Sequence, residues 1–475
     1  MDQDSQHTPP TGSVYPEPRA HVPPAPLLNI SPRSERKRWP LIVAALVGVG
    51  LVGAGAFYYM KNQPDRAVRD TAPAVKDTSW ASAGAVAEYN TLRVYESTSP
   101  GQKTYTITDD KGNKVAEASS NLDMAMITPV GTDMFLLKGD TKGSLTGPSY
   151  YVLDKNGLRL LSNLPASMVG ALNAQAPNKP TIAALGGTKV GFQYCKDVSE
   201  IPQGGDPYQC DFRTFDLSSG KETITAQSST LKEDNAKLKA FSPDKKVAYF
   251  MGITQQDTES LKKQVNKITG GGYHYEDDPA VQGLYKLHIP YVILKVELAS
   301  MKVLSSKKID VQYTRYGKFW LSPNGEHLVY SNGGEKGEVQ YIRIPDGYKA
   351  TIKLPGADMA SEPWSGETSS YDPLFSLDGN YMAFTTYISG PASSSLSFMG
   401  IIDLKTRTAN ITAQRSFTTS SMSDPLDFAG MRWYSNNQLE MTRDQENYRV
   451  DTAKAGFTIL DNSFGSLVGL ADDYR

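Results

Sequence analysis

Short alternating runs of apolar and polar residues fill the chain from about Val86 towards its C-terminus. The runs are rich in Val, Ile, Tyr, Phe and Thr, and Gly, Asn, Asp or Pro residues interrupt them at short intervals. A period of two is typical of half-buried β-strands, and the interruptions are typical of turns. Tyr150–Asp154 and Leu158–Ser162, for example, flank Gly157, and glycine readily adopts the positive φ that a tight hairpin requires. The pattern predicts an all-β fold of many short antiparallel strands.

A repeated turn sequence groups these strands into units. Its copies are, in chain order, Phe241-Ser242-Pro243-Asp244, Leu321-Ser322-Pro323-Asn324-Gly325, Phe375-Ser376-Leu377-Asp378-Gly379 and the weaker Trp433-Tyr434-Ser435-Asn436-Asn437. Each copy joins two apolar runs and a second pair follows, so the predicted unit is a four-stranded antiparallel sheet. The same template applied to the preceding residues gives three more units, at about 86–120, 121–164 and 180–227. About seven units predict a closed ring without open sheet edges, and six or eight remain alternatives.

The turns resemble the Ser-Pro-Asp-Gly hairpins of TolB-like, WD-related β-propeller repeats. FSPDKKVAYF, LSPNGEHLVY and FSLDGNYMAF carry the resemblance, which covers residues 238–461. It implies a β-propeller of about seven four-stranded blades over residues 86–463. The first half of this region has no such turn, and the terminal domain of TolB is absent, so the resemblance implies no TolB-type partner.

The two cysteines, Cys195 and Cys210, flank a loop that contains Pro202, Gly204, Gly205 and Pro207. If the blade template places them on neighbouring antiparallel strands, they meet at the base of this loop. A bridge closing a loop of roughly 15 residues stabilises by about 3 kcal/mol in the chain-entropy model. We therefore predict a structural disulfide, with two free thiols as the alternative, and a disulfide favours a location outside the cytoplasm.

Residues 252–290 form an insertion that does not fit a blade. Within it, Thr258–Ile268 would place Leu261, Val265 and Ile268 on one face of a short amphipathic helix. Long insertions in compact domains are often binding arms or lids. These three residues, together with Tyr273 and Tyr275, are candidates for contact with a partner, and the alternative is a solvated, mobile loop.

The same insertion holds the metal-site candidates His274, Glu276, Asp277 and Asp278. Imidazole suits Zn²⁺ and carboxylate oxygens suit Ca²⁺. However, the four residues match no calcium-loop spacing, and the sequence offers no second set of ligands. The alternative is a solvated loop, and we predict no metal site and no cofactor.

The segment Trp39–Met60 is uncharged and apolar over its whole length. As a helix it is long enough to cross a bilayer core of about 30 Å. Arg33, Arg36, Lys37 and Arg38 precede it, and this excess of basic residues favours a cytoplasmic N-terminus. The segment predicts a single-pass signal anchor in the cell membrane, with the C-terminal domain extracytoplasmic. A cleaved signal peptide is the alternative, because Ala54-Gly55-Ala56 has the small residues of a cleavage site.

The remaining segments are predicted to lie outside the folded domain. Residues 1–38 are rich in proline and poor in large apolar residues, which predicts a disordered cytoplasmic tail. Residues 61–85 are predicted to be a spacer, and residues 464–475 a C-terminal tail.

Composition and motifs narrow the range of functions. The net charge of −2 gives no basic footprint for nucleic acid. The sequence has no Gly-x-Ser-x-Gly nucleophile elbow, no phosphate-binding Gly-Lys-Ser/Thr loop and no His-Glu-x-x-His zinc motif. His327 lies in a repeat strand, which favours a packing role over that of a general base. We therefore predict no catalytic residues and a binding or scaffolding module for a protein or glycan partner at the cell surface. The alternative is a surface hydrolase or lyase that acts on glycans or peptides at the propeller channel.

Overall fold

The computed structural model of the chain describes Trp80 and most of residues 90–473. The segments outside the description within this range are 132, 141–147, 175–180, 198–207, 272–282, 285, 314–317, 332–337, 355–367, 390–393, 419–430, 444–445, 453 and 461–464. The chain divides at residues 73 and 74, and the unit Ala74–Arg475 is the one described below. The predicted cytoplasmic tail and membrane segment lie outside the described residues.

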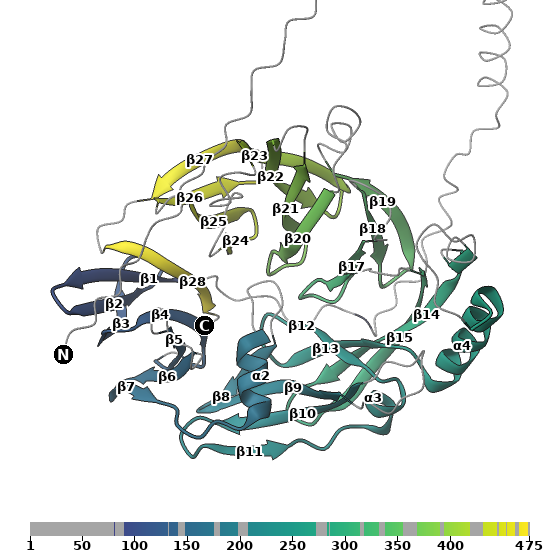
Figure 1. Cartoon of the computed structure of the whole chain (residues 1–475), viewed down its shortest axis with the longest axis horizontal. Helices are drawn as coiled ribbons and strands as arrows, with labels where there is room; N and C mark the ends of the chain where they lie inside the picture. The colour runs from purple at the N-terminus through teal and green to yellow at the C-terminus, as the bar shows by residue number, and fades with distance from the viewer. Residues whose placement is uncertain are drawn as a thin grey trace, which may run out of the picture. The chain divides into compact units, whose positions relative to one another are not determined.

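The described unit is a ring of seven antiparallel sheets with four strands each (Figure 1). Blade 1 contains β28 (Ser466–Asp473), β1 (Asn90–Ser99), β2 (Gln102–Thr108) and β3 (Lys114–Ser120). Blade 2 contains β4 (Asp123–Pro129), β5 (Phe135–Asp140), β6 (Ser149–Asp154) and β7 (Gly157–Leu160). Blade 3 contains β8 (Ile182–Gly186), β9 (Lys189–Asp197), β10 (Tyr208–Asp216) and β11 (Lys221–Ile224). Blade 4 contains β12 (Lys237–Phe241), β13 (Val247–Gly252), β14 (His288–Glu297) and β15 (Lys302–Gln312).

The last three blades repeat the same order. Blade 5 contains β16 (Phe319–Leu321), β17 (His327–Tyr330), β18 (Glu338–Arg343) and β19 (Tyr348–Lys353). Blade 6 contains β20 (Thr368–Phe375), β21 (Tyr381–Ser389), β22 (Ser394–Asp403) and β23 (Thr408–Thr418). Blade 7 contains β24 (Arg432–Ser435), β25 (Gln438–Arg443), β26 (Glu446–Asp451) and β27 (Lys454–Leu460). The prediction of an all-β propeller with about seven four-stranded blades is confirmed.

The repeated turn sequences join the first two strands of blades 4 to 7. In blade 4 the Ser242 side chain accepts a hydrogen bond from the Val247 backbone N–H at 2.9 Å, and its hydroxyl donates to Asp244 at 2.7 Å. Ser322 and Ser376 make the equivalent bonds in the next two blades. The fourth turn position has a positive φ, which explains the glycine at 325 and 379. Lys245 occupies the same position in blade 4 with a φ of 54°.

The connections between strands divide between two faces of the ring. Because neighbouring strands are antiparallel, the first and third connections of a blade lie at one end and the second connection lies at the other, together with the link to the next blade. We call the first end the turn face, since it carries the short repeated turns. We call the other end the loop face. It carries the helices α2 (Ala166–Ala174) and α3 (Ser229–Glu233) between blades and α4 (Gln255–Thr269) within blade 4.

The C-terminal region closes the ring. β28 pairs with β1, in register from Asn90↔Asp473 to Glu96↔Ser466 with one bulge, and so forms the innermost strand of blade 1. Residues 464–475 were predicted to be a tail, and for Ser466–Asp473 this prediction is wrong. β28 forms because it pairs with β1, which lies at the opposite end of the propeller sequence. A local pattern does not reveal such a partner.

Apolar clusters fill six of the seven joints between neighbouring blades among the described residues. The cluster between blades 4 and 5 includes Tyr249, Ile293, Leu328 and Ile342. Comparable clusters with side chains from both blades occupy the joints 1–2, 2–3, 3–4, 5–6 and 6–7. The joint between blades 7 and 1 differs, because the described apolar cluster there consists of Tyr95, Leu467 and Leu470, all from blade 1.

Trp80 belongs to the folded unit although it lies within the predicted spacer 61–85. Its side chain is 2% exposed and joins the apolar cluster between blades 4 and 5. For this residue the spacer prediction is therefore wrong. No helix in the part of the chain that the structure describes is long and apolar enough to cross a membrane.

Candidate functional site

Helix α4 emerges on the loop face from the connection between the second and third strands of blade 4. The side chain of Thr254 accepts a hydrogen bond from the Asp257 backbone N–H at 3.0 Å, and Gly270 ends the helix with a φ of 64°. These two caps explain its limits, because they satisfy free backbone groups at the N-terminus and allow a left-handed C-terminus. A helix was predicted over Thr258–Ile268, and α4 contains all of that range.

No residue of α4 is buried, although its sequence is amphipathic. Leu261, Val265 and Ile268 are partly exposed. Polar and basic side chains occupy the exposed positions of the last two turns, namely Lys263, Gln264, Asn266 and Lys267. One contact with the blade is an ion pair of 3.5 Å between Asp257 and Lys308 of β15. Figure 1 accordingly shows α4 at the periphery of the ring.

A disulfide closes a second connection on the loop face. Cys195 of β9 and Cys210 of β10 are direct partners in the strand register and form the predicted bridge. Next to it, the guanidinium of Arg213 lies 4.4 Å from the centre of the Tyr194 ring and pairs with Glu222. The bridge joins the two strand ends of a connection that lies on the loop face, as α4 does.

The other predicted contact and metal candidates cannot be placed. Tyr273, Tyr275, His274, Glu276, Asp277 and Asp278 lie outside the described residues. Among the residues that the structure does describe, no group of three His, Cys, Asp or Glu side chains is arranged to hold a metal ion.

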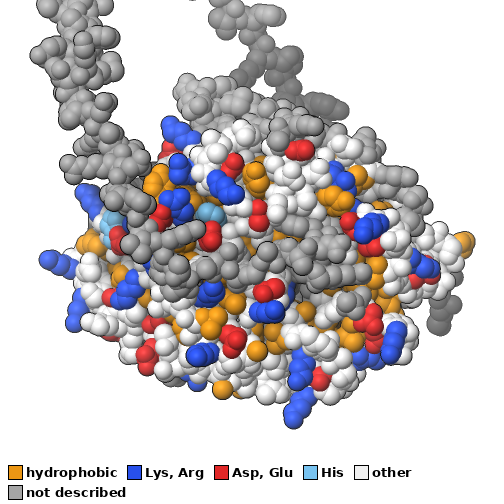
Figure 2. Space-filling view, turned by 180° about the vertical axis from the view of Figure 1, so that it is seen from behind, with side chains coloured by type: hydrophobic (Ala, Val, Ile, Leu, Met, Phe, Trp, Pro, Cys, Tyr) orange, Lys and Arg blue, Asp and Glu red, His pale blue; other side chains and the backbone are white. Residues whose placement is uncertain are grey.

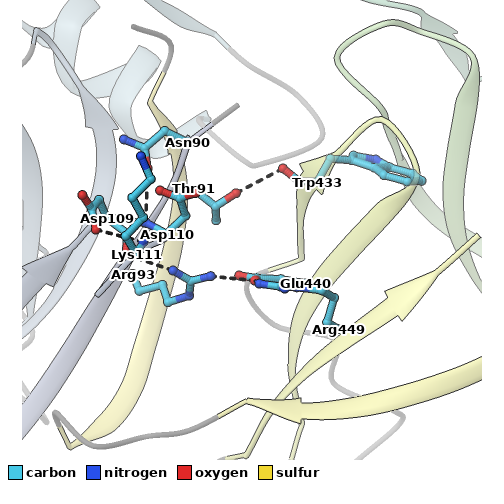
Figure 3. Close-up of polar contacts among 9 residues, drawn as sticks. All are labelled: Asn90, Thr91, Arg93, Asp109, Asp110, Lys111, Trp433, Glu440 and Arg449. Carbon is cyan, nitrogen blue, oxygen red and sulfur yellow. Dashed lines mark hydrogen bonds and ion pairs between the residues drawn. The ribbon is translucent and has the colours of Figure 1, made fainter. Parts of the chain in front are cut away.

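A buried ion cluster joins the last blade to the first (Figure 3). Glu440 of β25 is 1% exposed, and one of its oxygens, Oε1, accepts hydrogen bonds from Nη2 of Arg93 and Nη2 of Arg449, both at 2.6 Å. Arg93 comes from β1 and is 6% exposed, so this bond crosses the joint between blades 7 and 1. The Arg449 guanidinium also lies 3.5 Å from the centre of the Tyr434 ring. The cluster therefore places charge pairing where the other joints have apolar side chains.

Two further contacts brace the same joint near the turn face. The Thr91 hydroxyl donates to the Trp433 carbonyl across the joint at 3.1 Å. Nη1 of Arg93 donates to the Asp109 carbonyl at 3.0 Å and so connects the joint to the turn after β2. Burial acts to raise the pKa of Asp109, but hydrogen bonds from Asn113 and Lys111 outweigh it and lower that pKa. The second oxygen of Glu440, Oε2, is buried and has no hydrogen-bond partner among the described residues.

The chemistry of this cluster is structural in character. Two guanidinium groups share one carboxylate oxygen, so each guanidinium has an anionic partner in a region of low solvent access. None of these residues was predicted from the sequence. The signal that could have found Glu440 is a carboxylate inside the apolar run Leu439–Met441, since a buried charge requires a partner.

His327 is buried in β17, as a strand residue that packs. It is 4% exposed, and burial lowers the pKa of its imidazole to about 4. Nδ1 lies 2.8 Å from the Tyr341 hydroxyl, which satisfies one of its ring nitrogens. The side chain is therefore neutral at pH 7.

Charged side chains of both signs are mixed among the described residues on the face shown in Figure 2. This distribution agrees with the net charge of −2 over the whole chain.

Solved structures similar to this chain include several propellers with low sequence identity. A proposed 6-phosphogluconolactonase from Bacteroides uniformis is 12% identical, with a TM-score of 0.38, over 81% of this chain and 99% of that one. An oligogalacturonate lyase from Vibrio parahaemolyticus is 12% identical, with a TM-score of 0.34, over 79% and 86% of the two chains. A proposed TolB from Agrobacterium tumefaciens is 10% identical, with a TM-score of 0.30, over 68% and 89%.

No protein-family model matches the sequence, and no curated protein is detectably similar to it. The propeller assignment therefore rests on the strand order and closure described above.

Proposed function

We propose that this protein is a membrane-anchored, extracytoplasmic β-propeller of TolB-like repeat type that binds a protein partner through its loop face. Residues 39–60 serve as the anchor in this proposal. The disulfide between Cys195 and Cys210 supports an oxidising location, because disulfides persist mainly outside the cytoplasm.

Helix α4 is the observation that carries the binding proposal. A helix of 15 residues costs conformational entropy to order, and core burial usually offsets that cost. α4 contributes no buried side chain, so the propeller core gains little from it. Its partly exposed Leu261, Val265 and Ile268, next to exposed lysines and amides, are suited to contact a partner helix or groove.

Site-specific photocrosslinking in intact cells tests the binding proposal. A photoreactive amino acid replaces Lys263 on α4, and the matched control replaces Lys155, which is exposed in the turn between β6 and β7 on the turn face. We expect a discrete crosslinked protein from position 263 that disappears when Leu261 and Val265 are changed to Ser. Crosslinks of equal yield from both positions, or crosslinks insensitive to the two serines, contradict the proposal.

A separate measurement tests the anchor and the location. Membrane fractionation and external protease digestion of intact cells should place the propeller in the membrane fraction and outside the cytoplasm. A soluble, protease-protected domain with two free thiols contradicts this part alone, and leaves the crosslinking result to be judged by itself.

A further inference from the structure

Trp80 is a core residue of a ring that starts ten residues later in the sequence, at Asn90. Its ring centroid lies 6.2 Å from that of Tyr249 in blade 4. Its indole Nε1–H donates to the Gly325 carbonyl in blade 5 at 2.7 Å. The side chain therefore contacts both walls of the joint between blades 4 and 5, at the turn face.

Hydrogen bonds that do not involve Trp80 also join the blades around it. The Tyr249 hydroxyl donates to the Asn324 carbonyl at 3.0 Å, and Nδ2 of Asn324 donates to the Asp378 carbonyl of blade 6 at 2.6 Å. Gly325 has a φ of 72°, and a Cβ there would overlap the Tyr249 ring. The turn of blade 5 is therefore in close contact with the aromatic side chain of Tyr249, and its Gly325 carbonyl accepts the hydrogen bond from Trp80.

Trp80 lies on the side of the ring opposite β1, the strand that follows it in the sequence. In a ring of seven blades, the joint between blades 4 and 5 lies opposite blade 1, and the chain enters blade 1 at Asn90. Asn90 is at the turn-face end of β1, because it pairs with Asp473 at the end of the innermost strand. The N-terminal chain is therefore attached to the turn face at two separated points.

We propose that the joint between blades 4 and 5 is a binding site for an indole side chain, and that Trp80 occupies it as a ligand supplied by the chain itself. The Gly325 carbonyl recognises the indole N–H, and the apolar cluster around Tyr249 and Leu328 binds the ring. The site anchors the chain at Trp80 to the turn face. This inference does not depend on a membrane anchor or on a partner at α4.

Cleavage after folding tests the site in the full chain. A protease site replaces residues 83–88, between Trp80 and Asn90, and the folded protein is cut there and passed over a sizing column. We expect the N-terminal fragment to co-elute with the ring when Trp80 is present. With Trp80→Ala, retention should be weaker by a factor on the order of a hundred, because a buried tryptophan is lost.

A second measurement does not depend on the folding of that variant. N-acetyl-tryptophanamide, added to the cleaved wild-type protein, should compete for the site and release the fragment in a concentration-dependent way. Its N-methylindole analogue lacks the donor to Gly325 and should compete more weakly. Equal retention with Trp80→Ala, or a fragment that neither tryptophan analogue releases, overturns the proposal.

Discussion

Two joints on opposite sides of the ring are held by different chemistry. Between blades 4 and 5, Tyr249, Leu328 and other apolar side chains form a continuous cluster that also contains Trp80. Between blades 7 and 1, Glu440 of the last blade pairs with Arg93 of the first. Apolar burial depends on area and is tolerant of position, whereas paired charges in a region of low solvent access depend on geometry. We infer that the closing joint gains specificity of register from its charges.

This difference follows from how the two joints form along the chain. Blades 4 and 5 are neighbours in sequence, so a short connection brings their cores together. Closure instead requires β28 to find β1 across the whole propeller sequence. A long-range pairing gains most from contacts that distinguish the correct register from a shifted one.

Removal of β28 should have the largest effect. A chain that ends at 463 loses the innermost strand of blade 1 and the buried Leu467, Leu470 and Ala471. It also exposes the inner edge of β1, which invites aggregation. We expect loss of cooperative thermal unfolding or insoluble protein, measured by circular dichroism and sedimentation.

The matched control for this truncation ends at Asp473. It removes two residues after β28 and should unfold like the full chain. Cooperative unfolding of the shorter chain at an unchanged temperature would show that β28 is dispensable for closure.

Replacement of Glu440 should have the next largest effect. Glu440→Leu leaves Arg93 and Arg449 in a largely buried joint without their shared carboxylate. Breaking a buried pair from one side typically costs about 3–5 kcal/mol of unfolding free energy. Urea denaturation of the variant measures that loss directly.

The triple variant Arg93→Met, Glu440→Leu, Arg449→Met sharpens the comparison. Apolar residues of similar volume often replace a buried ion cluster without loss of stability. We expect the triple variant to regain most of the lost unfolding free energy, since it converts the closing joint to the chemistry of the other six. If it is instead as unstable as Glu440→Leu, the charges contribute net stability that apolar packing does not replace.

Local features of the fold could be predicted from the sequence, and long-range ones could not. The turns at Ser242, Ser322 and Ser376 were visible because their bonds lie within a few residues. α4 was visible from the spacing of its apolar residues. The sequence instead predicts a tail where β28 lies, because the partner strand β1 is distant in the sequence.

The same limit applies to single residues. Trp80 stands among small and polar residues with no repeating apolar pattern, so nothing local distinguishes it from an exposed tryptophan. Arg93 and Glu440 lie in strands far apart in the sequence, and only the ring brings them together. The cysteine pair was predictable because the blade template places Cys195 and Cys210 on neighbouring strands.

A buried titratable group in an apolar joint should behave differently from the paired charges at closure. His327 lies beside Tyr341, which belongs to the apolar cluster between blades 5 and 6. Its pKa is about 4 in the folded protein, because burial disfavours the charged imidazole, whereas the ordinary value for histidine is 6.5. Between these two values the unfolded chain binds more protons, so stability is lost as the pH falls from 6.5 towards 4.

The expected size of this loss is about 3 kcal/mol. Urea denaturation at pH 7.5 and pH 4 should therefore show a larger drop for the wild type than for His327→Gln, which cannot take up the proton. The carboxylates titrate in both proteins, and comparison of the two drops removes their contribution. Equal drops would mean that His327 is accessible to protons in the folded ring.

Substitutions on α4 should have the smallest effect on stability. Leu261→Ser with Val265→Ser changes two partly exposed side chains in a helix that contributes no buried residue to either kind of joint. Surface substitutions of this sort usually change the unfolding free energy by about 0.5 kcal/mol or less. A melting temperature close to that of the wild type, together with loss of the crosslink from position 263, would separate binding from folding. A large loss of stability would instead place α4 among the elements that hold the ring together, and the argument that it is retained for binding would fail.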